Sequence, residues 1–170
     1  MENGIINSLH NGTQVDHVIN LQFLRTEFPV EADVGFMTPV ALSDDGNILA
    51  ISSNPFTGID NAIRLWDTRS GKLLGTCKGH TEGVKGLAFS PDGKTLASSS
   101  SDSTLRLWDV RTQQELLSIQ RLADPIGDIL FSPDGNWLAA TTSSGFRVLD
   151  ASRDLDAART TASGNSPTAQ

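Results

Sequence analysis

The amino-acid sequence predicts an all-β fold built from repeats of similar length. A four-residue turn motif recurs with spacings of 47 and 42 residues, as Ser-Asp-Asp-Gly at 43–46 and as Ser-Pro-Asp-Gly at 90–93 and 132–135. Short apolar segments flank each motif, which is typical of an antiparallel hairpin because aspartate and glycine accept the backbone angles of a tight turn. A third strand, with an arginine between apolar residues, is predicted in each repeat at 62–67, 104–109 and 146–150.

The hairpin strands and a fourth strand follow from the same alternation of apolar segments and turn residues. The predicted hairpin strands are Pro39–Leu42, Ile48–Ile51, Val84–Phe89, Leu96–Ala97, Ile126–Phe131 and Leu138–Ala140. A polar turn and a short apolar strand then follow in the first two repeats, at Lys72–Cys77 and Glu115–Ile119. The third repeat has no such segment after residue 150, so its sheet is expected to lack an outer strand.

The middle repeat carries the most complete set of characteristic residues. Gly79-His80 opens it, the turn at 90–93 follows, Asp102 lies in the next turn, and Trp108-Asp109 ends the third strand. With a period of 40 to 45 residues, this set resembles the WD-repeat (Trp-Asp repeat) family of β-propellers. The resemblance covers roughly residues 32 to 150 and implies an all-β fold, a partial β-propeller of about three four-stranded antiparallel blades.

In the WD-repeat family a histidine, a serine or threonine, an aspartate and the tryptophan form a hydrogen-bonded tetrad within one blade. The resemblance implies that His80, Ser98, Asp102 and Trp108 take these places. A buried indole N–H, hydroxyl or imidazole that finds no partner costs on the order of 1–3 kcal/mol. A structural tetrad is therefore expected in the middle blade.

The two outer repeats depart from the tetrad pattern. The first repeat has Asp33 and Ile51 where His80 and Ser98 would align, but it keeps Asp60 and Trp66-Asp67. The four tetrad positions of the third repeat are occupied by Leu122, Ala140, Ser144 and Leu149. Replacement of every polar partner by apolar groups can be nearly neutral, so the third blade is expected to fold without a tetrad.

The sequence offers weak support for catalysis. Ser98, His80 and Asp102 could be read as a hydrolase triad, but no Gly-x-Ser-x-Gly nucleophile elbow is present and the tetrad also accounts for Trp108. His10 and His17, like His80, have no second ligand at metal-site spacing. We therefore expect no catalytic residue, no metal, no cofactor and no enzymatic activity.

Composition narrows the partners and the compartment. The formal net charge is −7 and the 13 Lys and Arg residues are dispersed, which disfavours direct binding of nucleic acid. No apolar stretch approaches the length of a membrane helix, and the N-terminus lacks the features of a signal peptide. An intracellular, cytoplasmic location is expected, with the nucleus as the alternative. The single cysteine, Cys77, is expected to be a buried structural thiol.

The repeats divide the chain into six segments. The expected segments are an N-terminal extension at 1–16, an outer strand at 17–31, a first WD-like repeat at 32–78, the complete repeat at 79–120, a degenerate repeat at 121–153 and a disordered tail at 154–170. The segment at 17–31 qualifies because Ile19, Leu21 and Phe23 alternate with polar residues.

Three blades are too few to close a propeller, since closed rings have at least four. One explanation is that further blades precede this chain in a longer protein. The other is a homodimer that completes a six-bladed ring, in which each N-terminal strand completes the third blade of its partner. The first explanation is favoured, because open sheet edges promote aggregation.

The resemblance implies a non-catalytic protein–protein interaction scaffold that binds peptides or proteins through one loop face. An insertion between the second and third strands of the first repeat is the most distinctive loop. Its candidate contact residues are Asn54, Pro55, Phe56, Thr57 and Ile59, joined by Glu82 and Lys85 of the middle repeat. The insertion could instead fold back over an open blade. Alternative functions are a C-terminal sensor or regulatory module of a larger signalling protein and a fragment of a propeller-type hydrolase or lyase.

Overall fold

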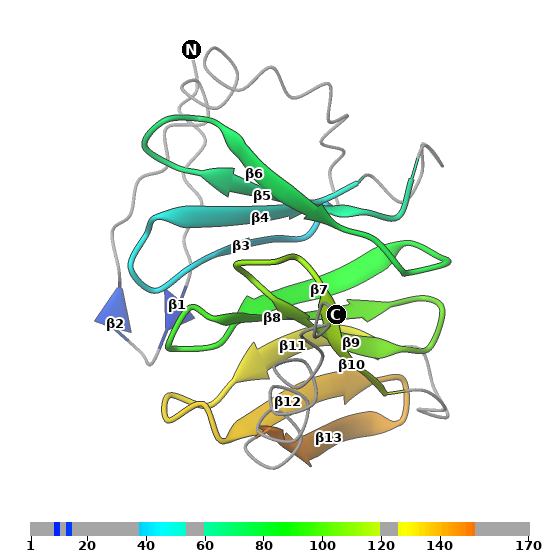
Figure 1. Ribbon diagram of the computed structural model, residues 1–170. Coiled ribbons are helices and arrows are strands. Elements are labelled where there is room, and N and C mark those ends of the chain that lie inside the picture. The colour runs from blue at the N-terminus through cyan, green and yellow to red at the C-terminus, as the bar shows by residue number, and fades with distance from the viewer. Residues whose placement is uncertain (1–8, 11–12, 15–37, 54–59, 120–125, 152–170) are drawn as a thin grey trace, which may run out of the picture.

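The computed structural model shows the chain as a set of antiparallel β-sheets (Figure 1). It describes residues 9–10, 13–14, 38–53, 60–119 and 126–151. Near the N-terminus, β1 (Leu9–His10) pairs with β2 (Thr13–Gln14). The remaining strands form three larger sheets, so the predicted all-β class is confirmed.

Each larger sheet follows the chain from strand to strand, and we call the three sheets the first, second and third blades. The first blade contains β3 (Val40–Leu42), β4 (Ile48–Ser52), β5 (Ile63–Asp67) and β6 (Leu73–Cys77). The second contains β7 (Val84–Phe89), β8 (Thr95–Ser100), β9 (Leu105–Asp109) and β10 (Glu115–Ile119). The third contains β11 (Ile126–Phe131), β12 (Trp137–Thr142) and β13 (Gly145–Asp150).

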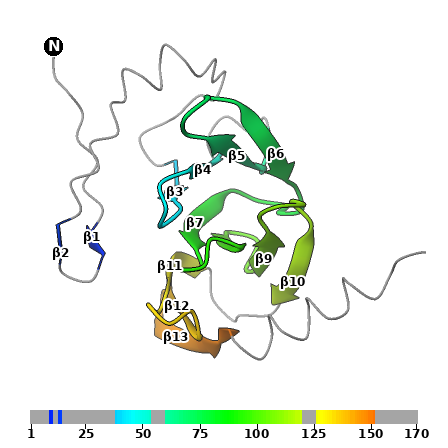
Figure 2. The same ribbon diagram turned by 60° about the vertical axis from the view of Figure 1, so that its left-hand side comes forward.

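The blades stack face to face, and their first strands β3, β7 and β11 lie next to one another (Figures 1 and 2). One apolar core lies between the first and second blades and includes Leu65, Leu96 and Trp108. A second core lies between the second and third blades and includes Leu107 and Leu138. This arrangement is a partial β-propeller, as the sequence predicts.

The repeated turn motif forms the same hydrogen-bonded network in each blade. In the second blade the Ser90 hydroxyl donates to the Asp92 carboxylate at 2.6 Å and accepts from the Thr95 amide at 3.0 Å. Gly93 has a φ of 67°, a left-handed angle that favours glycine. Ser43 and Ser132 make the corresponding bonds in the other blades. The motif thus fixes the hairpin that starts each blade.

The central strand of the middle repeat extends beyond its expected bounds. The second strand of the middle repeat runs from Thr95 to Ser100, longer than the predicted Leu96–Ala97. The run of three serines at its end is fully buried, and each hydroxyl has a hydrogen-bond partner, which makes a polar run compatible with a central strand.

Cys77 is buried at the end of β6, where burial raises the pKa of its thiol to about 12.

The first strands of the second and third blades approach very closely. A Cβ atom added at Gly86 would lie 2.7 Å from the carbonyl oxygen of Gly127 and 3.2 Å from the Asp128 Cα. The same Gly127 oxygen accepts a hydrogen bond from the Ser99 hydroxyl at 2.5 Å. The contact between these two blades therefore depends on a glycine at position 86.

Several predictions lie outside the described residues. They are the outer strand at 17–31, the inserted loop at 54–59, most of the N-terminal extension and the tail from 154 onward.

Candidate functional site

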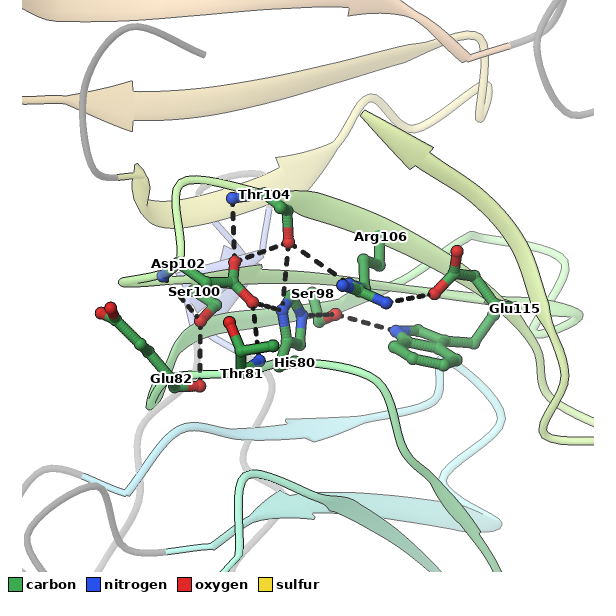
Figure 3. Close-up of polar contacts among 10 residues, drawn as sticks. His80, Thr81, Glu82, Ser98, Ser100, Asp102, Thr104, Arg106 and Glu115 are labelled. Atoms are coloured by element: carbon green, nitrogen blue, oxygen red, sulfur yellow. Dashed lines mark hydrogen bonds and ion pairs between the residues drawn. The ribbon is translucent and has the colours of Figure 1, made fainter. Parts of the chain in front are cut away.

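The polar side chains singled out in the middle repeat come from four places in the second blade. His80 lies just before β7, Ser98 in the middle of β8, Asp102 in the turn between β8 and β9, and Trp108 near the end of β9. Because β8 and β9 are antiparallel neighbours, with Leu96 opposite Trp108, the Ser98 side chain lies within reach of the indole. The structure brings all four side chains together, and Figure 3 shows His80 between Ser98 and Asp102.

The hydrogen bonds among these side chains run in one direction. The Trp108 Nε1–H donates to the Ser98 Oγ at 2.8 Å, and the Ser98 Oγ lies 2.7 Å from His80 Nε2. His80 Nδ1 lies 2.9 Å from an oxygen of Asp102. A neutral imidazole with its proton on Nδ1 satisfies every contact, since it donates to the carboxylate and accepts from the serine hydroxyl.

The second carboxylate oxygen of Asp102 is held by the turn itself. It accepts bonds from the Thr104 hydroxyl at 2.6 Å and the Thr104 amide at 2.9 Å, while the Thr81 amide donates to the first oxygen at 3.0 Å. Burial alone would raise the pKa of Asp102, but the bonds from Thr104, Thr81 and His80 outweigh it and lower the pKa to about 2. Asp102 is therefore an anion that fixes both the turn and the imidazole.

Neighbouring residues close the outer side of this cluster. Arg106 pairs with Glu115 of β10 at 2.5 Å, which ties β9 to the outermost strand of the blade (Figure 3). A Cβ atom at Gly79 would lie 2.5 Å from the Arg106 guanidinium and 3.1 Å from the Trp108 ring. The glycine before His80 thus leaves space for both side chains.

The same geometry argues against the hydrolase triad. A serine, a histidine and an aspartate do stand in the order that nucleophilic catalysis uses. However, Ser98 is 0% exposed, and its oxygen is already engaged by Trp108 on one side and His80 on the other. A substrate carbonyl has no path to this oxygen, so the arrangement is suited to stabilising the blade.

The buried imidazole makes the stability of the protein depend on pH. Burial lowers the pKa of His80 below its usual 6.5, and the nearby Asp102 only partly opposes this effect. The unfolded chain therefore binds a proton at a higher pH than the folded one does. We expect the free energy of unfolding to fall as the pH decreases from 7 to 5, by at most about 1.4 kcal/mol per pH unit from this group. Urea denaturation at several pH values measures the slope.

A variant with a neutral side chain isolates the contribution of His80. The His80→Gln protein retains a polar group but does not titrate, while His10 and His17 are the same in both proteins. The wild-type protein should therefore lose more stability than His80→Gln between pH 7 and pH 5. Parallel curves for the two proteins would show that His80 does not titrate differently in the folded and unfolded states.

The first blade has other residues at the equivalent positions, and they form a different polar cluster. Ile51 takes the place of Ser98, as the strand register shows by pairing it with Arg64. Arg64 binds the aspartate of the turn that precedes β5, forming an ion pair with Asp60 at 2.7 Å and a hydrogen bond to the Ser53 hydroxyl at 2.7 Å. Hydrogen bonding from Arg64 is the main cause that lowers the pKa of Asp60 to about 2. Arg64 thus binds the turn aspartate of the first blade, as His80 binds the turn aspartate of the second blade.

The third blade has no polar cluster at these positions in its described residues. Ala140 is buried where Ser98 lies, Leu149 takes the place of Trp108, and Ser144 is exposed in the turn. Asp33 and Leu122, the residues aligned with His80, lie outside the described residues.

The candidate partner-binding residues fall into two groups. Glu82 and Lys85 are exposed at the start of β7, on the end of the second blade where the turn with Asp102 also lies. Asn54, Pro55, Phe56, Thr57 and Ile59 lie outside the described residues. The described residues that flank this insertion, Ser53 and Asp60, are hydrogen-bonded to each other and so close its base.

Sequence reasoning missed several participants in these clusters. Thr104, Arg106 and Glu115 complete the second-blade cluster, and Arg64 with Ser53 forms the first-blade cluster. Thr104 carried a usable signal, because a hydroxyl two residues after a turn aspartate often bonds to it.

Two kinds of feature are absent from the described part of the chain. Within it, no three His, Cys, Asp or Glu side chains gather closely enough to hold a metal ion. The described residues also contain no helix of the length and apolar character needed to cross a membrane.

Antiparallel sheets that stack face to face, with a buried His–Ser–Trp–Asp cluster in one of them, define a repeat protein of the β-propeller class. Comparison with known families agrees: the family described as "WD domain, G-beta repeat" (WD40) matches residues 71–109 and 117–148. Over these residues the chain is therefore similar to the repeats of the WD-repeat family.

Individual relatives are similar over short segments. Nuclear distribution protein PAC1 of Mycosarcoma maydis is 56% identical over 39 residues, which are 23% of this chain and 9% of that protein. An uncharacterised WD repeat-containing protein of Synechocystis is 37% identical over 83 residues, 49% of this chain and 22% of that protein. Ribosome assembly protein 4 of Chaetomium thermophilum is 57% identical over 37 residues, 22% of this chain and 7% of that protein. The chain thus spans less than a quarter of each of these relatives.

Proposed function

We propose that this chain is a non-catalytic scaffold that binds a protein or peptide partner through the blade ends that carry Glu82 and Lys85. The observation that carries the proposal is the use of the polar cluster. Its Ser98, His80 and Asp102 groups are buried and bonded to one another, which makes a rigid blade and leaves no reactive group accessible there.

Glu82 and Lys85 of the second blade, and the described residues that flank the insertion of the first blade, lie at corresponding ends of their sheets. In the second blade, Ser100 donates to the carbonyl of Glu82 at 3.0 Å, which fixes the backbone of the segment that presents the Glu82 side chain. In the first blade, Ser53 and Asp60 hold the base of the insertion that contains Phe56. Loops held by a rigid sheet are frequent binding sites. The names of two relatives refer to nuclear distribution and to ribosome assembly, which suits a scaffold better than an enzyme.

Affinity capture with the intact chain tests the proposal. Lys85→Glu and Phe56→Ser should each reduce the recovery of a specific partner at least about tenfold, the effect expected of a binding hot spot. Lys94→Glu is the matched control, because Lys94 is also an exposed lysine but lies in the hairpin turn at the opposite end of the second blade. Equal recovery of every partner by Lys85→Glu, Phe56→Ser and the wild type would exclude this end of the blades.

The proposed scaffold function also bears on where in the cell the protein is located. We propose an intracellular, cytoplasmic location, with the nucleus as the alternative, from the composition and from the relatives whose names refer to nuclear distribution and ribosome assembly. The sequence also led to the proposal that additional blades or a second copy complete a ring. Such blades or such a copy would be further partners of the three blades.

A further inference from the structure

The hairpin turn that starts each blade contains an aspartate followed directly by a glycine. The three pairs are Asp45-Gly46, Asp92-Gly93 and Asp134-Gly135. All three aspartates are exposed. An aspartate before a glycine is especially prone to isomerise, because glycine has no Cβ atom to hinder the attack of its amide nitrogen on the preceding side chain. The turns therefore hold three sites whose sequence favours a spontaneous modification.

Isomerisation of such a pair needs no reactant other than water. The glycine nitrogen forms a bond to the aspartate Cγ, and the carboxyl hydroxyl leaves with the amide hydrogen as water, which gives a succinimide ring. Water then opens the ring. Opening at the side-chain carbonyl restores aspartate, whereas opening at the main-chain carbonyl gives isoaspartate, in which the chain continues through the side-chain carboxyl carbon. The extra methylene group in the backbone would disturb the hairpin.

In the folded chain both reacting groups of each pair are held by other partners. In the first blade the Gly46 amide donates to the Ser43 carbonyl oxygen at 2.8 Å. The Asp45 carboxylate accepts from the Ser43 hydroxyl at 2.6 Å and from the Asn47 amide at 3.0 Å. The bonds from the glycine amide and from the serine hydroxyl recur in the other two turns. The serine of the motif thus contacts the nitrogen through its carbonyl oxygen and the carboxylate through its hydroxyl.

The serine hydroxyl also favours the ionised form of the aspartate. The bond from Ser43 is the largest cause that lowers the pKa of Asp45, and the bond from Ser132 is the largest cause that lowers the pKa of Asp134. The neutral carboxyl group is the reactive form, because an ionised carboxylate repels the nitrogen and has no hydroxyl to release. A bond that stabilises the anion therefore slows the reaction, in addition to holding the carboxylate in place.

We propose that the serine of each turn motif protects the Asp-Gly pair that follows it from isomerisation. Asp45, Asp92 and Asp134 are thus latent sites of isoaspartate formation, which become reactive where the serine hydroxyl is absent. This role adds to the part that the hydroxyl plays in the hairpin, where it accepts a bond from the amide of the next strand. Because the protection rests on contacts within each turn, it does not depend on what else the blades contact.

Peptide mapping after prolonged incubation of the purified chain tests the proposal. Ser43→Ala, Ser90→Ala and Ser132→Ala should each raise the rate of isoaspartate formation in its own turn at least about tenfold, as expected for the loss of a hydrogen bond to a charged group. The other two turns of each variant are internal controls and should keep the wild-type rate. A protease that cleaves before aspartate but not before isoaspartate distinguishes the two forms, which have the same mass. The peptides are separated first, since Asn3-Gly4 and Asn11-Gly12 also yield isoaspartate, by deamidation.

A matched variant separates protection of the pair from a general loss of stability. Ser100→Ala removes another buried hydroxyl from the second blade, one that bonds to the Glu82 carbonyl oxygen, and it should leave the rate at Asp92 unchanged. An unchanged rate at Asp92 in Ser90→Ala, or an equal rise in all three turns, would overturn the proposal.

The dependence of the rate on pH separates the effect on the carboxylate from a looser turn. In the wild-type protein the rate at Asp45 should fall as the pH rises through the pKa of its carboxyl group. Ser43→Ala should shift this fall to higher pH, because the main cause of the lowered pKa is gone. The same fall at the same pH in both proteins would contradict the proposal and show that the serine acts only by closing the turn. No partner takes part in these measurements, so their outcome is separate from that of the proposed scaffold function.

Discussion

Replacement of Trp108 by alanine is expected to lower the free energy of unfolding by about 3–5 kcal/mol. The indole is 1% exposed and lies in the core between the first and second blades, beside Leu65 and Leu96. Its removal leaves a cavity and deprives the Ser98 hydroxyl of a donor. Since natural domains have a total stability of roughly 5–15 kcal/mol, this one change is expected to remove a large part of it. Urea denaturation followed by circular dichroism measures the loss.

Two further variants separate burial from hydrogen bonding at this position. Trp108→Phe keeps most of the apolar contact and loses the indole N–H, so it should cost about 1–3 kcal/mol. Leu73→Ala removes an exposed apolar side chain from β6 and should change stability by about 0.5 kcal/mol or less. If Trp108→Ala costs no more than Leu73→Ala, Trp108 does not stabilise the contact between the blades.

The strands and hairpin turns could be predicted from the sequence because their determinants are local. The turn at 90–93 places a serine, an aspartate and a glycine within four residues, and these residues bond mainly to one another and to the start of the next strand. The grouping of His80, Ser98, Asp102 and Trp108 needed one more step, the antiparallel register of two adjacent strands. That register follows from the turn that joins them.

Contacts that depend on packing between distant residues could not be predicted in this way. The third strands of the first and second blades carry an arginine at the same place. However, Arg64 binds Asp60, whereas Arg106 binds Glu115. In the second blade His80 already binds Asp102 and Glu115 lies opposite Trp108. In the first blade Leu73 takes the place of Glu115, so the outer strand offers Arg64 no carboxylate there. The choice depends on which neighbours are present in three dimensions.

The exposure of apolar side chains on the third blade could not be predicted from the sequence either. Val148 and Leu107 occupy equivalent positions in strands of similar sequence, and alternation alone predicts that both are buried. Leu107 is covered by the third blade, whereas Val148 is exposed. Periodicity identifies the apolar side of a strand, but it does not tell whether another sheet covers that side.

The close approach of the second and third blades leads to the other prediction with a large effect. Replacement of Gly86 by valine is expected to lower the free energy of unfolding by about 2–3 kcal/mol, within the range known for overpacked cores. A Cβ atom there would lie 2.7 Å from the Gly127 carbonyl oxygen, and that oxygen is held on its other side by the Ser99 hydroxyl. Backbone cannot yield as a flexible side chain does, so the two blades must move apart. Gly86→Ala should show a smaller loss in the same direction.

Hydrogen exchange can show where the Gly86→Val protein is weakened. The amides of β11 should lose more protection than those of β4 and β5, because the strain lies between the second and third blades and the first blade does not share it. Lys85→Val is the matched control: it places the same side chain on the adjacent residue, which is exposed, and should leave both stability and exchange nearly unchanged. Equal loss of protection in all three blades would show that the strands unfold as one unit and that the Gly86 contact does not hold the third blade separately.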